Sequence, residues 1–110
     1  MRIRNLTPHK ITVYGKDSQI LLVLESEGIA RAEQRNAPVG DLEGIPLLKQ
    51  TFGIPVDLPD YEKGTYLIVS SITVNAAKAA GRTTEDLLLT SVPVRDAEGR
   101  IIGCKAFALV

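Results

Sequence analysis

His9 is the first candidate for chemistry, because it is the only histidine among the 110 residues. An imidazole titrates near neutral pH, so a histidine can act as a base, ligate a metal or contact a phosphate. Thr7 and Pro8 bring a hydroxyl and a fixed backbone corner but no second basic group. One histidine cannot form a two-histidine metal site. Two interpretations stay open: His9 hydrogen-bonds backbone at this corner, or it contacts a ligand.

Ser70 and Ser71 stand between a β-branched apolar run and an alanine-rich segment, which indicates a strand-to-helix junction. The free backbone N–H groups at a helix start, together with the positive end of the helix dipole, suit a phosphate or a carboxylate. No glycine-rich loop precedes the serines, so the chain has neither a P-loop nor a dinucleotide-binding fingerprint. Serine is also an ordinary N-cap residue. Helix capping is therefore the first interpretation of the junction, and an anion site is the alternative.

The remaining reactive groups are three loop carboxylates, one thiol and several arginines. Asp57, Asp60 and Glu62 lack the spacing and the glycine of a calcium loop, so a solvated acidic loop is expected. Cys104 is the only cysteine, which excludes an internal disulfide and a cysteine-based zinc site, and its apolar surroundings predict a buried, inert thiol. Guanidinium groups match phosphate well, but each arginine is also an ordinary surface or ion-paired residue. The arginines considered are Arg31, Arg35, Arg82, Arg95 and Arg100.

Hydrophobic patterning in the first half of the chain predicts short strands joined by turns. Residues 11–14 and 20–24 are apolar and β-branched runs around a Gly-Lys-Asp-Ser turn, which is typical of a β-hairpin. Residues 29–35 alternate and predict a strand with one charged face. Residues 45–52 predict another short strand, after a turn bracketed by glycines and a proline. Residues 53–63 contain two prolines and three acids, and are predicted to be a loop.

The second half contains the strongest strand and helix signals. Residues 65–69 read Thr-Tyr-Leu-Ile-Val, and residues 71–80 contain four alanines before Gly81, which predicts a helix capped by a serine. Residues 92–95 and 101–109 predict a last hairpin around a glycine-containing turn. The chain is therefore expected to be an α+β, strand-rich single domain over 1–110. It would contain about seven short strands, in a mixed sheet or partial barrel, and one main helix.

Composition limits the class of protein. Apolar residues make up 45% and charged residues 24% of a chain long enough for one core, so it should fold. Thirteen basic and thirteen acidic residues cancel, which disfavours binding to a nucleic-acid polymer. The amino terminus has no apolar signal-peptide run, and the longest apolar run is far too short for a membrane span of about 20 residues. We expect a cytoplasmic protein.

Several short motifs together resemble a family of small, mostly uncharacterised proteins of phages, prophages and bacteria. The most specific are the opening Asn-Leu-Thr-Pro-His and the closing hairpin. The resemblance covers residues 5–9, 26–31, 44–46, 64–65 with 68–70, and 94–96 with 99–104. Other compact phage proteins without catalytic machinery sequester nucleotide-derived immune signals, such as cyclic nucleotides or cyclic ADP-ribose isomers. The resemblance implies, by analogy, the same role here.

We therefore predict a homo-oligomer, not an enzyme, that binds a small phosphorylated nucleotide-like ligand without cofactor or metal and counteracts host anti-phage defence. The residues predicted to line its pocket are Asn5, Thr7, His9, Arg31, Ser70, Ser71 and Arg95. The first alternative is a structural or protein-interaction module that uses an exposed sheet edge and has no small ligand. A hydrolase that uses His9 with the loop carboxylates ranks last, because one histidine and no acid pair provide little for acid–base catalysis.

Overall fold

Eight strands and one helix make up the computed structural model, which describes residues 1–110. The α+β, strand-rich fold with one helix is confirmed, and so are the first and last predicted hairpins. In chain order the elements are β1 Arg2–Asn5, β2 Ile11–Tyr14, β3 Ile20–Leu24, β4 Arg31–Leu42, β5 Ile45–Val56, β6 Thr65–Ile68, α1 Ser71–Ala79, β7 Leu87–Arg95 and β8 Ile101–Leu109.

Six strands form one mixed sheet in the order β1-β6-β7-β8-β2-β3. The β1–β6, β6–β7 and β2–β8 pairs are parallel, whereas β7–β8 and β2–β3 are antiparallel hairpins. The two ends of the sheet meet at one point, where Asn5 and Ser26 form a bridge and the Glu27 N–H donates to the Asn5 carbonyl at 2.8 Å. The sheet is therefore nearly barrel-shaped, and its two ends are joined around this contact.

Neighbouring residues of the central strands pack into two separate apolar clusters, because successive side chains of a strand point to opposite faces. Leu67 and Leu87 face helix α1, whereas Ile68 and Leu88 face the curved interior. The cluster under α1 consists of Leu6, Ala30, Leu67, Val69, Val74, Ala77 and Leu87. The interior cluster consists of Ile11, Val13, Ile68, Leu88 and Cys104.

Helix α1 begins and ends as the sequence predicts. The Ser70 hydroxyl accepts a hydrogen bond from the Thr73 N–H at 3.3 Å, and Gly81 follows the helix with a left-handed φ of 78°. The buried Thr73 hydroxyl donates to the Ala30 carbonyl at 3.0 Å, so the helix is tied to the segment that enters β4. No helix in the structure is long and apolar enough to cross a membrane.

A buried ion pair fixes the chain after α1. Both Nη atoms of Arg82 lie 2.9 Å from the two carboxylate oxygens of Asp86, which is only 2% exposed. Arg82 also donates to the Pro59 carbonyl at 2.7 Å, so one guanidinium connects the helix exit to the loop between β5 and β6. The planar guanidinium can donate two parallel hydrogen bonds to one carboxylate, whereas a lysine ammonium acts as a point charge.

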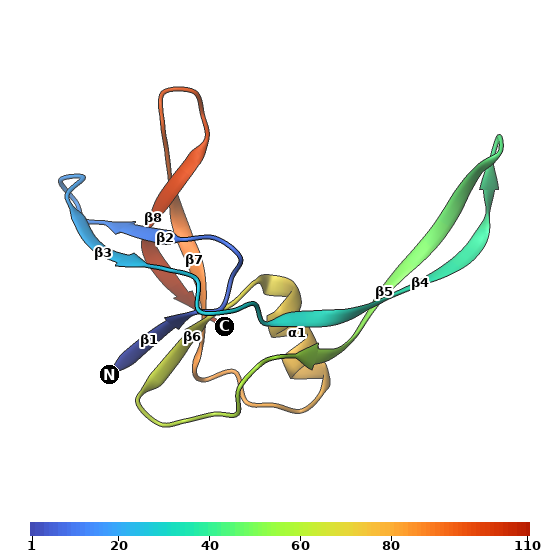
Figure 1. Cartoon of the computed structure of the whole chain (residues 1–110), viewed down its shortest axis with the longest axis horizontal. Helices are drawn as coiled ribbons and strands as arrows, with labels where there is room; N and C mark the ends of the chain where they lie inside the picture. Colours follow the sequence, from blue (N-terminus) through green and yellow to red (C-terminus); the bar gives the residue numbers. More distant parts are fainter.

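Strands β4 and β5 form a separate two-stranded ribbon that projects far from the six-stranded sheet (Figure 1). We call this ribbon, residues 31–56, the arm. The predicted turn is present at Glu43 and Gly44, whose φ values of 49° and 87° match a two-residue hairpin turn. The predicted strand lengths were wrong, because each strand has 12 residues. The predicted loop at residues 53–63 was wrong for its first four residues, which belong to β5.

The sequence signal failed in the arm because prolines and glycines interrupt it. Pro38, Gly40, Pro46 and Pro55 are poor residues for a central strand. A two-stranded ribbon has no central strand, and register shifts beside Pro38 and Gly53 absorb the irregular positions.

Two further strands differ from prediction. Strand β1 was not predicted, since its polar sequence has no strand pattern, but it pairs in parallel with β6 over four residues. The predicted strand 92–95 is the end of a longer strand, β7, which begins at Leu87. Val92 within it has a φ of 54°, an unusual conformation for a β-branched residue.

Candidate functional site

The largest cleft lies between the corner that precedes β2 and the start of β8. Thr7, His9, Lys10 and Ile11 form one wall. The other wall consists of Thr90, Ile101, Ile102, Gly103 and Cys104. The volume of the cleft is about 380 Å³, within the range of small-molecule sites.

Gly103 allows the two walls to approach each other. A Cβ atom at this position would collide with the backbone oxygen of Thr12 and, at 2.6 Å, with the ring of Tyr14. Only glycine permits β8 to pass so close to β2. The backbone of Gly103 therefore brings Ile101 and Ile102 beside the His9 corner.

Asn5 holds the corner in place from behind. Its Nδ2 donates to the carbonyls of His9, at 2.7 Å, and Leu24, at 3.1 Å. Its Oδ1 accepts from the Thr7 N–H at 3.0 Å and from the Thr7 hydroxyl at 2.6 Å. Asn5 is fully buried, and all its amide groups are satisfied within the protein. We assign it to the scaffold of the cleft.

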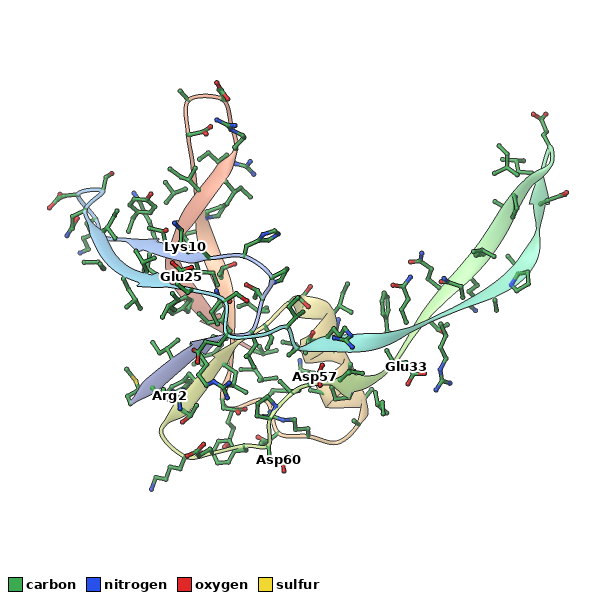
Figure 2. All side chains as sticks on the ribbon, in the orientation of Figure 1. Arg2, Lys10, Glu25, Glu33, Asp57 and Asp60 are labelled. Carbon is green, nitrogen blue, oxygen red and sulfur yellow. The ribbon has the colours of Figure 1, made fainter.

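The polar wall carries one positive charge that forms no salt bridge. Lys10 is exposed and forms no ion pair. Glu25 follows β3 opposite Lys10, since Ile11 pairs with Leu24, and Figure 2 shows the two side chains in this region. His9 is also exposed, and its ring hydrogen-bonds to no protein group. Lys10 and His9 thus provide N–H donors for an anion.

The apolar wall has exposed isoleucines and a buried thiol. Ile101 is 61% exposed and Ile102 44%, although both are large apolar residues. Burial raises the pKa of the Cys104 thiol, more than hydrogen bonds from the backbone of Ala106 and Ser91 lower it. The thiol is therefore protonated at neutral pH, and Cys104 is buried, as the sequence predicted.

The cleft brings together only part of the predicted ligand set. Thr7 and His9 line it, and Asn5 lies behind it. Arg31 lies at the base of the arm. Its guanidinium is 3.3 Å from the Asp57 carboxylate, and both side chains are exposed. The other predicted residues lie elsewhere: Ser70 caps α1, Ser71 begins it, and Arg95 donates to the Gly99 carbonyl at 2.8 Å in the last hairpin.

Sequence reasoning missed Lys10 and the two isoleucines. Lys10 had a local signal, since it follows His9 directly and adds a charge to that corner. Ile101 and Ile102 had none, because their place depends on the parallel contact of β2 with β8, which joins residues far apart in the sequence.

The other charged groups serve local structure. Backbone hydrogen bonds lower the pKa of Asp96, chiefly the bond from the Arg100 N–H, with smaller contributions from Glu98, the Arg100 side chain and Gly99. A hydrogen bond from Arg35 to Glu33 at 2.7 Å raises the pKa of that arginine. No group of three or more histidine, cysteine, aspartate or glutamate side chains is arranged to hold a metal ion.

Comparison of the chain with protein-family models, curated proteins and solved structures finds no match. The resemblance to the phage and prophage family therefore stays a prediction.

Proposed function

We propose that the cleft binds a small phosphorylated, nucleotide-like ligand without turning it over, and that this binding sequesters the ligand. The observation that carries the proposal is that two walls of different chemistry line one cleft. Lys10 and His9 offer donors to an anion on one side, and Ile101 and Ile102 offer an exposed apolar surface on the other. A nucleotide has the same two parts, a phosphate and a flat base.

Each wall has a defined task in this proposal. Lys10 contacts the phosphate as a point charge, and the His9 ring donates a hydrogen bond beside it. The base packs on Ile101 and Ile102, which are covered when the ligand enters. Because no carboxylate orients His9 and the Cys104 thiol is protonated, we infer binding rather than catalysis.

The biological setting of this proposal comes from the sequence resemblance. In the cytosol of a bacterial host, a phage-type protein of this kind would withdraw a nucleotide-derived immune signal, such as a cyclic nucleotide or a cyclic ADP-ribose isomer. It would counteract anti-phage defence by mass action alone, without cofactor or metal.

The arm favours a second candidate function, a structural or protein-interaction module with no small ligand. Every residue from 34 to 52 is exposed, including several large apolar ones. A ribbon of this kind is a typical surface for protein association.

A thermal-shift screen tests the first candidate. Cyclic mononucleotides, cyclic dinucleotides, ADP-ribose and its cyclic isomers are each added to the purified protein. A ligand that binds only the folded state stabilises it by about 2.7 kcal/mol at a hundredfold excess over its Kd. We expect one compound class to raise Tm and to be recovered intact by mass spectrometry. If no compound raises Tm, the interaction module becomes the better candidate, and loss of the compound would indicate turnover.

Calorimetry on variants then locates the site. His9→Ala and Lys10→Ala should each weaken binding at least tenfold, about 1.4 kcal/mol, while the Tm of the free protein changes little. Lys63→Ala, which removes an exposed lysine outside the cleft, is the matched control. Arg31→Ala should leave binding unchanged, because Arg31 is absent from both walls. Loss of binding in Arg31→Ala alone would move the site to the base of the arm.

A further inference from the structure

The outer part of the arm is apolar on both faces. Ile45 and Leu47 point to one side of the ribbon, and Pro46 and Leu48 to the other, because successive residues of a strand alternate. The large apolar residues here are between 42% and 63% exposed: Val39, Leu42, Ile45, Leu47 and Leu48. We call this part, residues 38–48, the tip. A ribbon that merely covered its own domain would be apolar on one face only.

The arm makes this chain far more extended than a compact monomer. The radius of gyration is 16.8 Å, whereas about 13 Å is typical of a compact chain of this length. The accessible surface is 7508 Å², against roughly 6,000 Å² for a compact monomer of this mass. The excess is larger than the roughly 800 Å² that each partner buries in a standard interface. An isolated two-stranded ribbon is also marginally stable in water, so the arm needs a partner surface.

A matching acceptor lies at the base of the same arm. A groove of about 290 Å³ runs between the arm and helix α1. Its apolar lining includes Phe52 and Ile54, which are 48% and 63% exposed, and the small side chains of Ala76 and Ala79. Arg35 stands at its edge. The tip of the same chain points away from this groove, as Figure 1 shows, so it cannot fill it.

The charges of tip and groove are complementary. The tip carries Asp41 and Glu43 and no basic residue. The groove carries Arg35, whose exposed guanidinium also pairs with Glu33 of the same strand at 2.7 Å. Two arms that lie antiparallel around a two-fold axis bring each acidic tip to the other copy's Arg35. Such an axis crosses β4 near Val39, which is halfway along the chain between Arg35 and Glu43. The Val39 residues of the two copies meet there.

We propose that two copies of this chain associate by reciprocal exchange of their arms, with the tip of each seated in the groove of the other. Donor and acceptor occur on one chain, so a two-fold axis satisfies both contacts at once. Pro38 and Pro46 have no N–H to donate, which opposes a continuous sheet between the arms. The contact is therefore made by side chains. This assembly does not depend on the proposed ligand.

Sedimentation equilibrium of the full chain tests the exchange. The wild type should have twice the 11.9 kDa mass of one chain. Ile45→Asp/Leu47→Asp should be monomeric, because it places carboxylates on one apolar face of the tip. Lys16→Glu, at an exposed turn outside the arm, is the control and should stay dimeric. Circular dichroism of each variant checks that the chain is folded.

Charge exchange tests the reciprocal arrangement. Asp41→Lys/Glu43→Lys makes the tip basic, and Arg35→Glu makes the groove acidic. Each variant alone should dimerise at least tenfold more weakly than wild type, and an equimolar mixture should form a heterodimer more tightly than either variant alone. A monomeric wild type, a dimer that survives Ile45→Asp/Leu47→Asp, or a mixture no tighter than its components would each overturn the proposal. A monomeric wild type would assign the arm to a different protein.

Discussion

At the scale of single residues, Asn5 and Lys10 have different roles at the cleft: Asn5 supports it and Lys10 lines it. Asn5 uses its whole amide to join three segments, the corner at Thr7 and His9, its own strand, and the end of β3. Lys10 uses none of its donors within the protein and faces the cleft. The opening Asn-Leu-Thr-Pro-His motif therefore combines a buried anchor with exposed groups at its other end.

Replacement of Asn5 tests its scaffold role. Asn5→Ala should lower the free energy of unfolding by about 2–4 kcal/mol, because it removes the hydrogen bonds of a buried amide to Thr7 and to the carbonyls of His9 and Leu24. Urea denaturation followed by circular dichroism measures this change. The matched control, Asn36→Ala on the exposed arm, should stay within about 0.5 kcal/mol of wild type. A stable Asn5→Ala protein that no longer binds ligand would instead place Asn5 in direct contact with the ligand.

At the scale of elements, the start of α1 is explained by capping. Ser70 accepts from the Thr73 N–H, its hydroxyl lies 3.0 Å from that of Thr73, and the Thr73 hydroxyl reaches Ala30. This chain of contacts connects the helix to the segment that leads into the arm. Ser70 and Thr73 thus fix the position of the helix, and with it one wall of the groove at the base of the arm.

Two serine variants separate capping from ligand binding. Ser70→Ala should lower the free energy of unfolding by about 1 kcal/mol, the usual cost of losing an N-cap. Ser71→Ala removes an exposed hydroxyl without a protein partner, so stability should stay within about 0.5 kcal/mol of wild type. Thermal and urea unfolding measure both. If Ser71→Ala weakens binding of the compound found in the screen, the anion site lies at the helix start and not in the cleft.

At the scale of the whole molecule, stability is divided between a closed sheet and an open arm. Only 18 of the 110 residues are buried, and none of them lies in the arm. The core is therefore stabilised by its contacts with α1 and within the curved sheet, whereas the arm has no buried residue of its own. A partner that binds only the folded chain raises the free energy of unfolding by mass action, whether it binds the core or the arm.

The Tm of the wild type should rise with protein concentration, because dimerisation stabilises the folded chain. A shortened arm removes this dependence. Asn36 and Gln50 are cross-strand partners, so a two-residue Asn-Gly turn can join them in place of residues 37–49. Differential scanning calorimetry at several concentrations should give a constant Tm for the shortened chain. A wild-type Tm that does not change with concentration would contradict association through the arm.

Local sequence determined the parts of this protein that depend on near neighbours. The hairpin of β2 and β3, the helix with its serine cap and following glycine, and the last hairpin each combine an apolar pattern with a suitable turn. The burial of Cys104 also followed from its apolar segment. These features arise within a few residues, so propensity and periodicity are enough to predict them.

Tertiary structure alone decided the cleft and the arm. The cleft exists because β8 passes close to β2 at Gly103. This approach places Ile101 in the same cleft as His9, although about ninety residues separate them in the sequence. The sequence did not predict the length of the arm, because its prolines and glycines have a low strand propensity. Only the pairing of β4 with β5 holds these residues in strands. Contacts between distant segments depend on how the chain closes on itself, which no local pattern encodes.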